Sequence, residues 1–177
     1  LRASYVANFS VFRSIPDAWA VQQLFPVMPI HRLDEEPDEL GILMDLTCDS
    51  DGKIDRFVDP QRLKPGLELH STRMGEPYVL AVLLVGAYQE VLGNSHNLLG
   101  RPDELSVTVE KGGALELEAR PTPDRIDGIV RAAGWDPDEL EAAARRGLAG
   151  AGRSQSERAR LESELKRLRK GSSYLSN

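Results

Sequence analysis

The only cysteine of the chain, Cys48, is followed at once by Asp49, and a second carboxylate, Asp51, lies two residues further on. A thiol and carboxylates at such close spacing can hold and transfer protons, so this stretch is a candidate for acid–base chemistry. Ser50, Asp51 and Gly52 are typical of a tight turn, in which Gly52 is the residue that tolerates positive φ. The sequence therefore predicts a thiol and two acids presented on one turn.

Two plainer interpretations compete with that one. A single cysteine is often a small buried hydrophobic residue, and Asp-x-Asp-Gly also occurs in ordinary turns. A calcium-binding loop is excluded, because its register would place Thr47 first and Val58 last, where acidic ligands are required. The motif alone leaves a reactive and a structural cysteine both open.

The stretches on either side of this turn alternate as strands do. Before it, residues 41–46 place Ile42, Met44 and Leu46 on one face, and after it the alternation resumes over residues 54–58. The candidate turn therefore connects two predicted strands.

Bulk composition narrows the classes of protein. The chain has 177 residues, of which 41% are hydrophobic and 28% charged, as in a globular protein of one or two domains. Its net charge of -6 argues against a nucleic-acid-binding surface and favours small cationic ligands. One cysteine allows no internal disulfide, which indicates a reducing compartment. No apolar run is long enough for a membrane span, and the N-terminus is not a signal peptide. Leu1 is not a start methionine, and a strand pattern with no preceding turn or cap begins almost at once, so we expect the chain to be a segment of a longer polypeptide.

The first part of the chain is predicted to be mainly β, with one inserted helix. Residues 5–12 alternate as a half-buried strand, and a serine cap at Ser14 begins a helix that continues over residues 18–25. Residues 78–85 are the most apolar run, which is typical of a strand buried on both faces. Tyr88 follows in the polar tip of that strand, where a core tyrosine with a satisfied hydroxyl and a functional tyrosine both remain open.

The last part changes period. Strands at residues 105–109 and 115–119 flank Lys111-Gly112-Gly113, which predicts a hairpin. Three helices are then expected. The first begins at Ile126 and is stopped by Gly134, the second follows a cap at Asp136, and the third follows a cap at Ser154. We expect a β domain over residues 1–122 and a helical region over residues 123–177.

Three histidines are the remaining candidates for metal ligands. They are His31, His70 and His96. Their spacing matches no zinc motif, so no metal site is predicted from the residues.

Six stretches, in this order, resemble one family. They are residues 8–12, 15–20, 26–33, 47–55, 85–90 and 96–98. The family is the biosynthetic arginine decarboxylases, large bacterial and plant enzymes of the alanine-racemase-like pyridoxal phosphate class (fold type III). The resemblance is dense over residues 4 to 120 and looser in the tail that ends at residues 173–175. Leu99 departs from it, because an aromatic residue is expected after His-Asn-Leu.

The resemblance implies a fold and an assembly. The parent enzyme would have an N-terminal (β/α)8 barrel that carries the cofactor lysine and is not part of this chain. The chain would be the mainly β, barrel-like C-terminal domain with the family's C-terminal helices. Active sites in relatives of this fold form between the subunits of a homo-oligomer, so the Cys48 turn would serve the partner's cofactor and Tyr88 its own.

The resemblance also implies the chemistry, decarboxylation of L-arginine to agmatine for polyamine synthesis in the cytoplasm. Pyridoxal 5'-phosphate would stabilise the carbanion left by loss of CO2, and Cys48 would return a proton, since a thiol of ordinary pKa, about 8.5, is mostly protonated at neutral pH. Asp49 or Asp51, or both together, would bind the guanidinium, and Tyr88 would donate its hydroxyl to the cofactor phosphate. Magnesium is implied by the family alone, with no ligand cluster to hold it.

None of the five lysines of the chain stands in a context that resembles the family's cofactor lysine, and Lys53 belongs to the turn. We therefore expect the chain alone to be inactive and to bind no pyridoxal phosphate covalently. The alternatives are a related decarboxylase of ornithine, lysine or diaminopimelate, a non-catalytic regulatory module of the same fold, and a β domain of another binding function.

Overall fold

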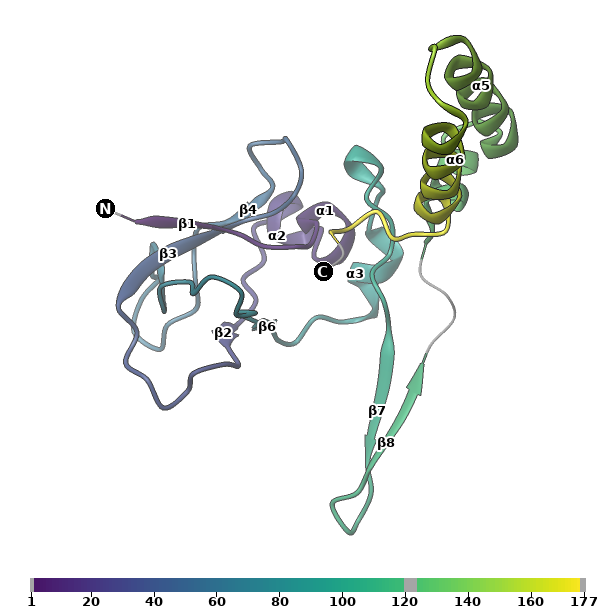
Figure 1. The fold of residues 1–177 in the computed structure, drawn as a ribbon. Coiled ribbons are helices and arrows are strands. Elements are labelled where there is room, and N and C mark those ends of the chain that lie inside the picture. The colour runs from purple at the N-terminus through teal and green to yellow at the C-terminus, as the bar shows by residue number, and fades with distance from the viewer. Residues whose placement is uncertain (1, 120–123, 176–177) are drawn as a thin grey trace. The chain divides into compact units, whose positions relative to one another are not determined.

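The structure of the chain is a computed structural model that describes residues 2–119 and 124–175. It divides into two compact units, Leu1–Asn97 and Leu98–Asn177, each with its own strands and helices (Figure 1). The predicted domain boundary between residues 122 and 123 lies outside the described residues and stays a prediction.

A four-stranded sheet forms the framework of the first unit. Its central strand, β3 (Glu39–Met44), pairs in parallel with β1 (Ala3–Val6). Along the opposite edge, β3 pairs antiparallel with β4 (Lys53–Ile54) and β5 (Leu67–Leu69). The predicted strands beside the Cys48 turn are thus present, although the second one is reduced to the two residues of β4.

The predicted strand over residues 5–12 is only partly correct. β1 ends at Val6, and a short helix, α1 (Val11–Ser14), follows. Ser10 caps this helix, because its Oγ accepts a hydrogen bond from Arg13 N at 3.2 Å. Val11 and Phe12 are both buried, which the alternation of a half-buried strand would not allow.

The predicted helix over residues 18–25 is shorter than expected. It is α2 (Asp17–Ala20), which begins after Pro16 without a side-chain cap, so the capping serine is Ser10 of α1 and not Ser14. The chain leaves the helical conformation at Gln22, whose φ is +59°. Phe25 then enters the core cluster. That cluster comprises Val11, Ile15, Phe25, Leu43, Ile54, Phe57 and Leu69.

The prediction of a long buried strand over residues 78–85 is wrong. Only β6 (Leu80–Val82) is extended, and it pairs with β2 (Val27–Pro29) in a two-stranded ribbon. With one neighbouring strand, the apolar residues beyond β6 are left uncovered, and Leu84 is 84% exposed. The expected polar tip of this strand is instead a helix, α3 (Ala87–Leu92).

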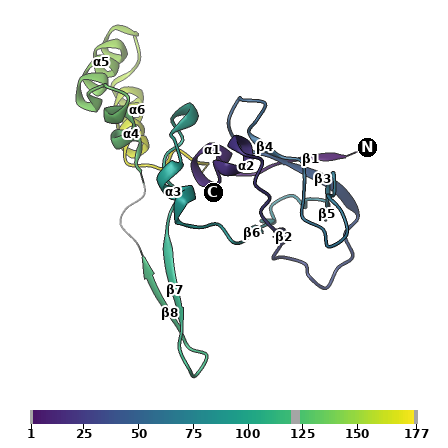
Figure 2. The ribbon, with the colours of Figure 1, turned by 180° about the vertical axis from the view of Figure 1, so that it is seen from behind.

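The second unit contains the predicted hairpin and the three predicted helices (Figure 2). β7 (Leu105–Val109) and β8 (Leu115–Ala119) pair antiparallel, and Gly113 supplies the positive φ of their turn. The helices are α4 (Ile126–Ala132), α5 (Pro137–Gly150) and α6 (Gln155–Arg169). The caps at Asp136 and Ser154 are confirmed, the latter as a complete capping box.

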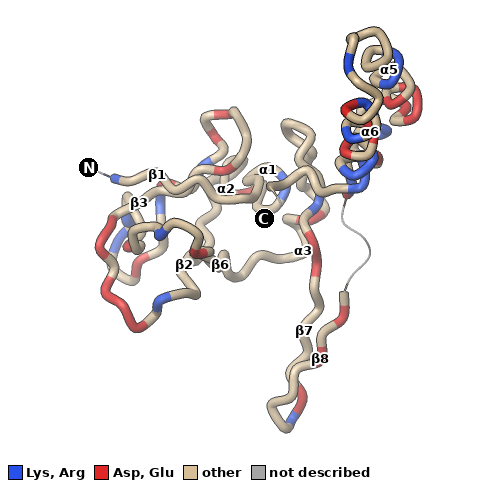
Figure 3. The backbone as a smooth tube through the Cα atoms, in the orientation of Figure 1, with Lys and Arg blue, Asp and Glu red and all other residues tan. Residues whose placement is uncertain are grey.

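Charged side chains join these three helices, which carry both signs of charge (Figure 3). Arg169, at the end of α6, lies 2.8 Å from Asp127 of α4 and 2.6 Å from Asp138 of α5, and it also contacts Glu141. Its guanidinium holds the pKa of the Asp127 carboxyl below the ordinary value, and together with Arg145 it lowers the pKa of Glu141. One arginine therefore ties the helical region together.

The fold class is confirmed in its coarser form, sheets followed by helices. The described strands form one sheet of four strands and two of two strands. Closure of a barrel is a finer expectation than these sheets support.

Candidate active site at the Cys48 turn

The turn that carries Cys48 connects β3 to β4 and is closed by its own backbone. Asp45 N donates to Gly52 O at 2.8 Å, and Gly52 N donates to Asp49 O at 3.1 Å. Asp51 N donates to the Asp49 carboxylate at 2.9 Å. These hydrogen bonds close the loop that carries the thiol and both predicted acids.

Gly52 is required here for a different reason from the one expected. Its φ is not in the positive region, so the turn does not use the tolerance of positive φ that the sequence analysis noted. A Cβ at this position would lie 2.2 Å from Asp45 Oδ1 and 2.3 Å from Thr47 Oγ1. Glycine therefore allows the backbone to approach a buried carboxylate closely.

That carboxylate, Asp45, is 5% exposed and joins the turn to α1. Its Oδ2 accepts from Val11 N at 2.8 Å, and its Oδ1 accepts from Thr47 N at 2.7 Å and Thr47 Oγ1 at 2.6 Å. Three donors compensate the cost of burying the charge. Sequence reasoning missed Asp45, although it shares the face of Gly41 and Leu43, which is the buried face of β3.

Two residues that the sequence analysis did not assign to the site reach the turn from the short helix η1 (His96–Leu98). Asn97 Nδ2 donates to the exposed Cys48 Sγ at 3.3 Å. His96 Nε2 lies 3.7 Å from Asp49 Oδ2. The only signal in the sequence was that His96 and Asn97 belong to one of the stretches that resemble the family.

His96 is itself held by a buried ring. Its imidazole stacks on Phe12 with 4.2 Å between the centroids and 24° between the planes. Phe12 is 3% exposed and also contacts Trp19. The residue next to Phe12 is Val11, which donates to Asp45, so the start of α1 contacts both Asp45 and His96.

Tyr88, the fourth predicted site residue, stands on a separate element. It is 79% exposed, so it is not a core tyrosine. Its neighbour Gln89 is buried and pairs with Asp17, donating to Oδ2 at 2.7 Å and accepting from the backbone N at 3.1 Å. Since Gln89 fixes the inward face of α3, Tyr88 is directed outward with its hydroxyl available to a ligand.

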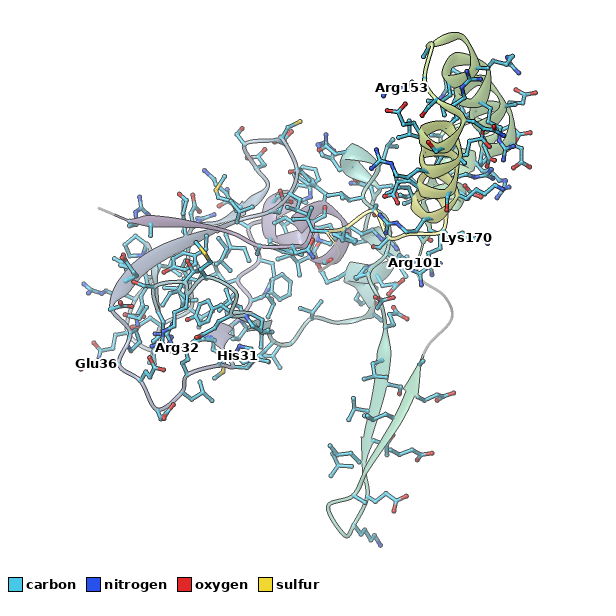
Figure 4. The ribbon with its side chains drawn as sticks, viewed as in Figure 1. His31, Arg32, Glu36, Arg101, Arg153 and Lys170 are labelled. Carbon is cyan, nitrogen blue, oxygen red and sulfur yellow. The ribbon has the colours of Figure 1, made fainter. Side chains whose placement is uncertain are left out.

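The other two histidines have local partners. His31, which is labelled in Figure 4, contacts Pro77 O through Nδ1 at 2.9 Å. The buried His70 contacts the Tyr78 hydroxyl at 2.8 Å. Over residues 2–119 and 124–175, no three side chains of histidine, cysteine or acidic residues are grouped to hold a metal ion. Nor is any helix in these two ranges both long and apolar enough to span a bilayer.

The lysines of the turn region are engaged in ion pairs. Lys53 Nζ lies 3.2 Å from Asp55, and Lys64 Nζ lies within 3.3 Å of both Asp59 and Glu68. The exposed phenol of Tyr88 is a hydrogen-bond donor of the kind that the phosphate of pyridoxal phosphate, the cofactor that the resemblance implies, would require, while Lys53, the lysine of the turn, is paired with a carboxylate. These residues fit non-covalent contacts to such a cofactor.

Comparison with known proteins finds relatives of this chain, although no family model matches it. It is 43% identical over 176 residues to the biosynthetic arginine decarboxylase of Pseudomonas aeruginosa, an alignment that covers 99% of this chain and 28% of that protein. It is 52% identical over 140 residues to the biosynthetic arginine decarboxylase of a Synechococcus strain, covering 79% of this chain and 20% of that one.

A solved structure agrees with these relatives. The crystal structure of the biosynthetic arginine decarboxylase SpeA from Campylobacter jejuni matches with a TM-score of 0.85 at 33% identity. The match covers 98% of this chain and 29% of that one. The chain thus spans less than a third of the length of each of these proteins.

Proposed function

Since the chain is homologous over nearly its whole length to part of the biosynthetic arginine decarboxylases, we propose that it is the C-terminal region of such an enzyme. The whole enzyme would convert L-arginine to agmatine and CO2 at the start of polyamine synthesis. The observation that carries the proposal is this homology, together with an exposed thiol on a turn that buried contacts hold in place.

Each predicted site residue has a role that its surroundings allow. Pyridoxal phosphate, when bound, would stabilise the negative charge that loss of CO2 leaves on the substrate. Cys48 is exposed and would donate the proton that replaces the lost carboxyl group. Asp49, whose side chain is 39% exposed, and the exposed Asp51 would accept hydrogen bonds from the guanidinium. Tyr88 would donate to the cofactor phosphate.

The proposal includes the rest of the polypeptide as a partner. Apolar side chains occupy one face of the β7–β8 hairpin, and each is more than half exposed. They are Leu105, Val107, Val109, Leu115 and Leu117. A two-stranded hairpin with an uncovered apolar face is marginal alone. This surface supports packing against further chain, which we propose to be the N-terminal barrel, in a homo-oligomer whose active sites are shared and whose β domain is barrel-like.

A cytoplasmic location is part of the same proposal. Cys48 is exposed and free, and a proton-donating thiol must stay reduced. The chain alone would be inactive, because its cofactor lysine would lie in the barrel. Magnesium, which the resemblance implies, is assigned no site on this chain.

A chimera tests the proposal. This chain would replace the corresponding 29% of the Campylobacter jejuni enzyme, and the product would be supplied with pyridoxal phosphate and assayed for CO2 from arginine, ornithine, lysine and diaminopimelate. We expect agmatine from arginine and little reaction with the other three. Release of CO2 from ornithine or lysine instead would favour the related decarboxylases. A folded chimera that binds pyridoxal phosphate but acts on none of them would favour the non-catalytic module.

A further inference from the structure

His96 and Asn97 form a strap across the Cys48 turn, and the proposed chemistry assigns them no role. They reach it from η1, about 50 residues further along the chain, and each contacts one of the two adjacent site residues. The strap is anchored by the stack of His96 on Phe12 and by Asn94 N, which donates to Phe12 O at 3.1 Å. It is therefore a tertiary feature and not part of the turn's own geometry.

We propose that Asn97 and His96 are positioning residues of the site, Asn97 for the Cys48 thiol and His96 for the Asp49 carboxylate. The catalytic roles of these two residues rest on the proposed function. Their contacts with Cys48 and Asp49 are observed independently of that function.

The direction of the Asn97 contact suits a proton donor. The amide Nδ2–H donates to sulfur, so the thiol's own proton is not used in the contact and remains available to a substrate. After that proton has left, the same N–H faces a thiolate and stabilises its negative charge. One hydrogen bond therefore orients the sulfur before the transfer and stabilises the product of the transfer.

The backbone at the strap is held in an uncommon conformation. Asn97 has φ +53° and ψ +26°, and Leu98 has φ +61°. Asparagine tolerates this left-handed region better than most residues with a side chain. Asn97 thus combines a backbone conformation that the loop requires with a side-chain donor that reaches Sγ.

His96 holds the second residue through a rigid support. Its ring is stacked on the buried Phe12, so the position of Nε2 beside Asp49 depends little on side-chain freedom. Asp49 Oδ1 accepts a hydrogen bond from Asp51 N at 2.9 Å, and His96 Nε2 lies 3.7 Å from Oδ2, so each carboxylate oxygen has a polar neighbour. That leaves the carboxylate in a defined orientation toward a cationic ligand.

The single cysteine allows a direct test without cofactor or substrate. We would measure the rate of alkylation of Cys48 by iodoacetamide at fixed pH in the chain, in Asn97→Gly and in Asn97→Asp. Both replacements tolerate the left-handed backbone and remove the donor, and Asp adds a repulsive charge. Alkylation is expected to slow several-fold in Asn97→Gly and about tenfold in Asn97→Asp, since loss of an ordinary intramolecular hydrogen bond changes an equilibrium by several-fold and a repulsive charge adds to that effect.

The matched control is Leu98→Asn, which keeps the neighbouring left-handed backbone and changes an exposed side chain. Its rate is expected to stay within about twofold of the parent rate. The proposal is overturned if either Asn97 variant reacts as fast as the parent or faster. Circular dichroism of each variant separates this outcome from unfolding.

Kinetics of the full-length chimera then separate the two roles. Asn97→Gly is expected to lower kcat with little change in KM, because the proton transfer is affected and arginine binding is not. His96→Phe keeps the stack on Phe12 and loses Nε2, so KM for arginine should rise several-fold, and His96→Gln should restore part of that loss. Equal kinetics in all of these variants and the parent chimera would contradict the roles. If the parent chimera is inactive, the proposed function fails, while alkylation still decides the role of Asn97.

Discussion

The Cys48 turn and the β7–β8 hairpin turn both connect antiparallel strands through a glycine, yet different interactions hold them. The hairpin is closed by ladder hydrogen bonds and by Gly113 at φ +81°. The Cys48 turn depends on the buried Asp45, on the close approach of Gly52 and on contacts from η1. The structure of a turn that is fixed by local geometry can be predicted from the sequence of its own four residues. The structure of a turn that is fixed by tertiary contacts cannot be predicted in that way.

The largest effect expected from this difference is at the two glycines. Gly52→Ala would place a Cβ against oxygens of Asp45 and Thr47, so we expect the free energy of unfolding to fall by about 3 kcal/mol. Gly112→Ala, in the hairpin turn, meets nothing within 4 Å and has no positive φ, so its effect should be below about 0.5 kcal/mol. Urea unfolding followed by circular dichroism measures both. Equal effects at the two positions would remove the distinction between the turns.

The buried carboxylate comes next. Asp45→Asn keeps the size of the side chain but replaces one acceptor by a donor that faces other donors, which should cost about 2 kcal/mol. Glu116→Gln, on the polar face of the hairpin, is the control and should leave the unfolding free energy within about 0.5 kcal/mol of the parent value. The same urea titration applies. An unchanged free energy of unfolding in Asp45→Asn would mean that the carboxylate of Asp45 does not hold the turn.

The helical region contains a second cluster of charged residues, around Arg169, and we expect its loss to change stability less than the loss of the Asp45 carboxylate. Arg169 lowers the pKa of Asp127 and Glu141. Carboxyls whose pKa is lower in the folded state contribute stability above their unfolded pKa, about 4, and lose it as the pH falls through the folded value. Helical circular dichroism should therefore decline in acid, and the decline should be weaker in Arg169→Met. The same acid profile in both proteins would show that Arg169 does not hold these helices.

The smallest effect is expected on the apolar face of the hairpin. Leu117 is 59% exposed, so Leu117→Ser should change the stability of the isolated chain by less than about 0.5 kcal/mol. In the chimera the same change should lower the melting temperature by several degrees if other chain covers that face. A loss of stability already present in the isolated chain would contradict the view that this face packs only on other parts of the protein.

The elements predicted correctly from the sequence are those with local signals. The hairpin follows from Gly112 and Gly113, and two helix starts follow from Asp136 and Ser154. The predicted strand over residues 5–12 is correct only as far as Val6, because the Ser10 cap and the hydrogen bond from Val11 N to Asp45 outweigh the alternation beyond it. The apolar run over residues 78–85 was predicted to be a buried strand, but its sequence does not indicate which surface would cover it.

The part of the candidate site that could be predicted is likewise the part with a local signal in the sequence. Cys48, Asp49 and Asp51 are adjacent in sequence, so their place on one turn followed from the turn residues. Asp45 was hidden because its donors come partly from Val11, 34 residues earlier. His96 and Asn97 were hidden because their contacts span about 50 residues. Tyr88 was assigned by resemblance, and its helix was not foreseen.

The most direct test of the central claim is to measure kcat for arginine decarboxylation in two proteins, the parent chimera and the chimera that carries Cys48→Ala. If this chain supplies the proton-donating thiol, kcat should fall by about 10²-fold or more, while KM for arginine stays within about twofold. An unchanged kcat in a folded Cys48→Ala chimera would contradict the account, because the thiol would then take no part in the reaction.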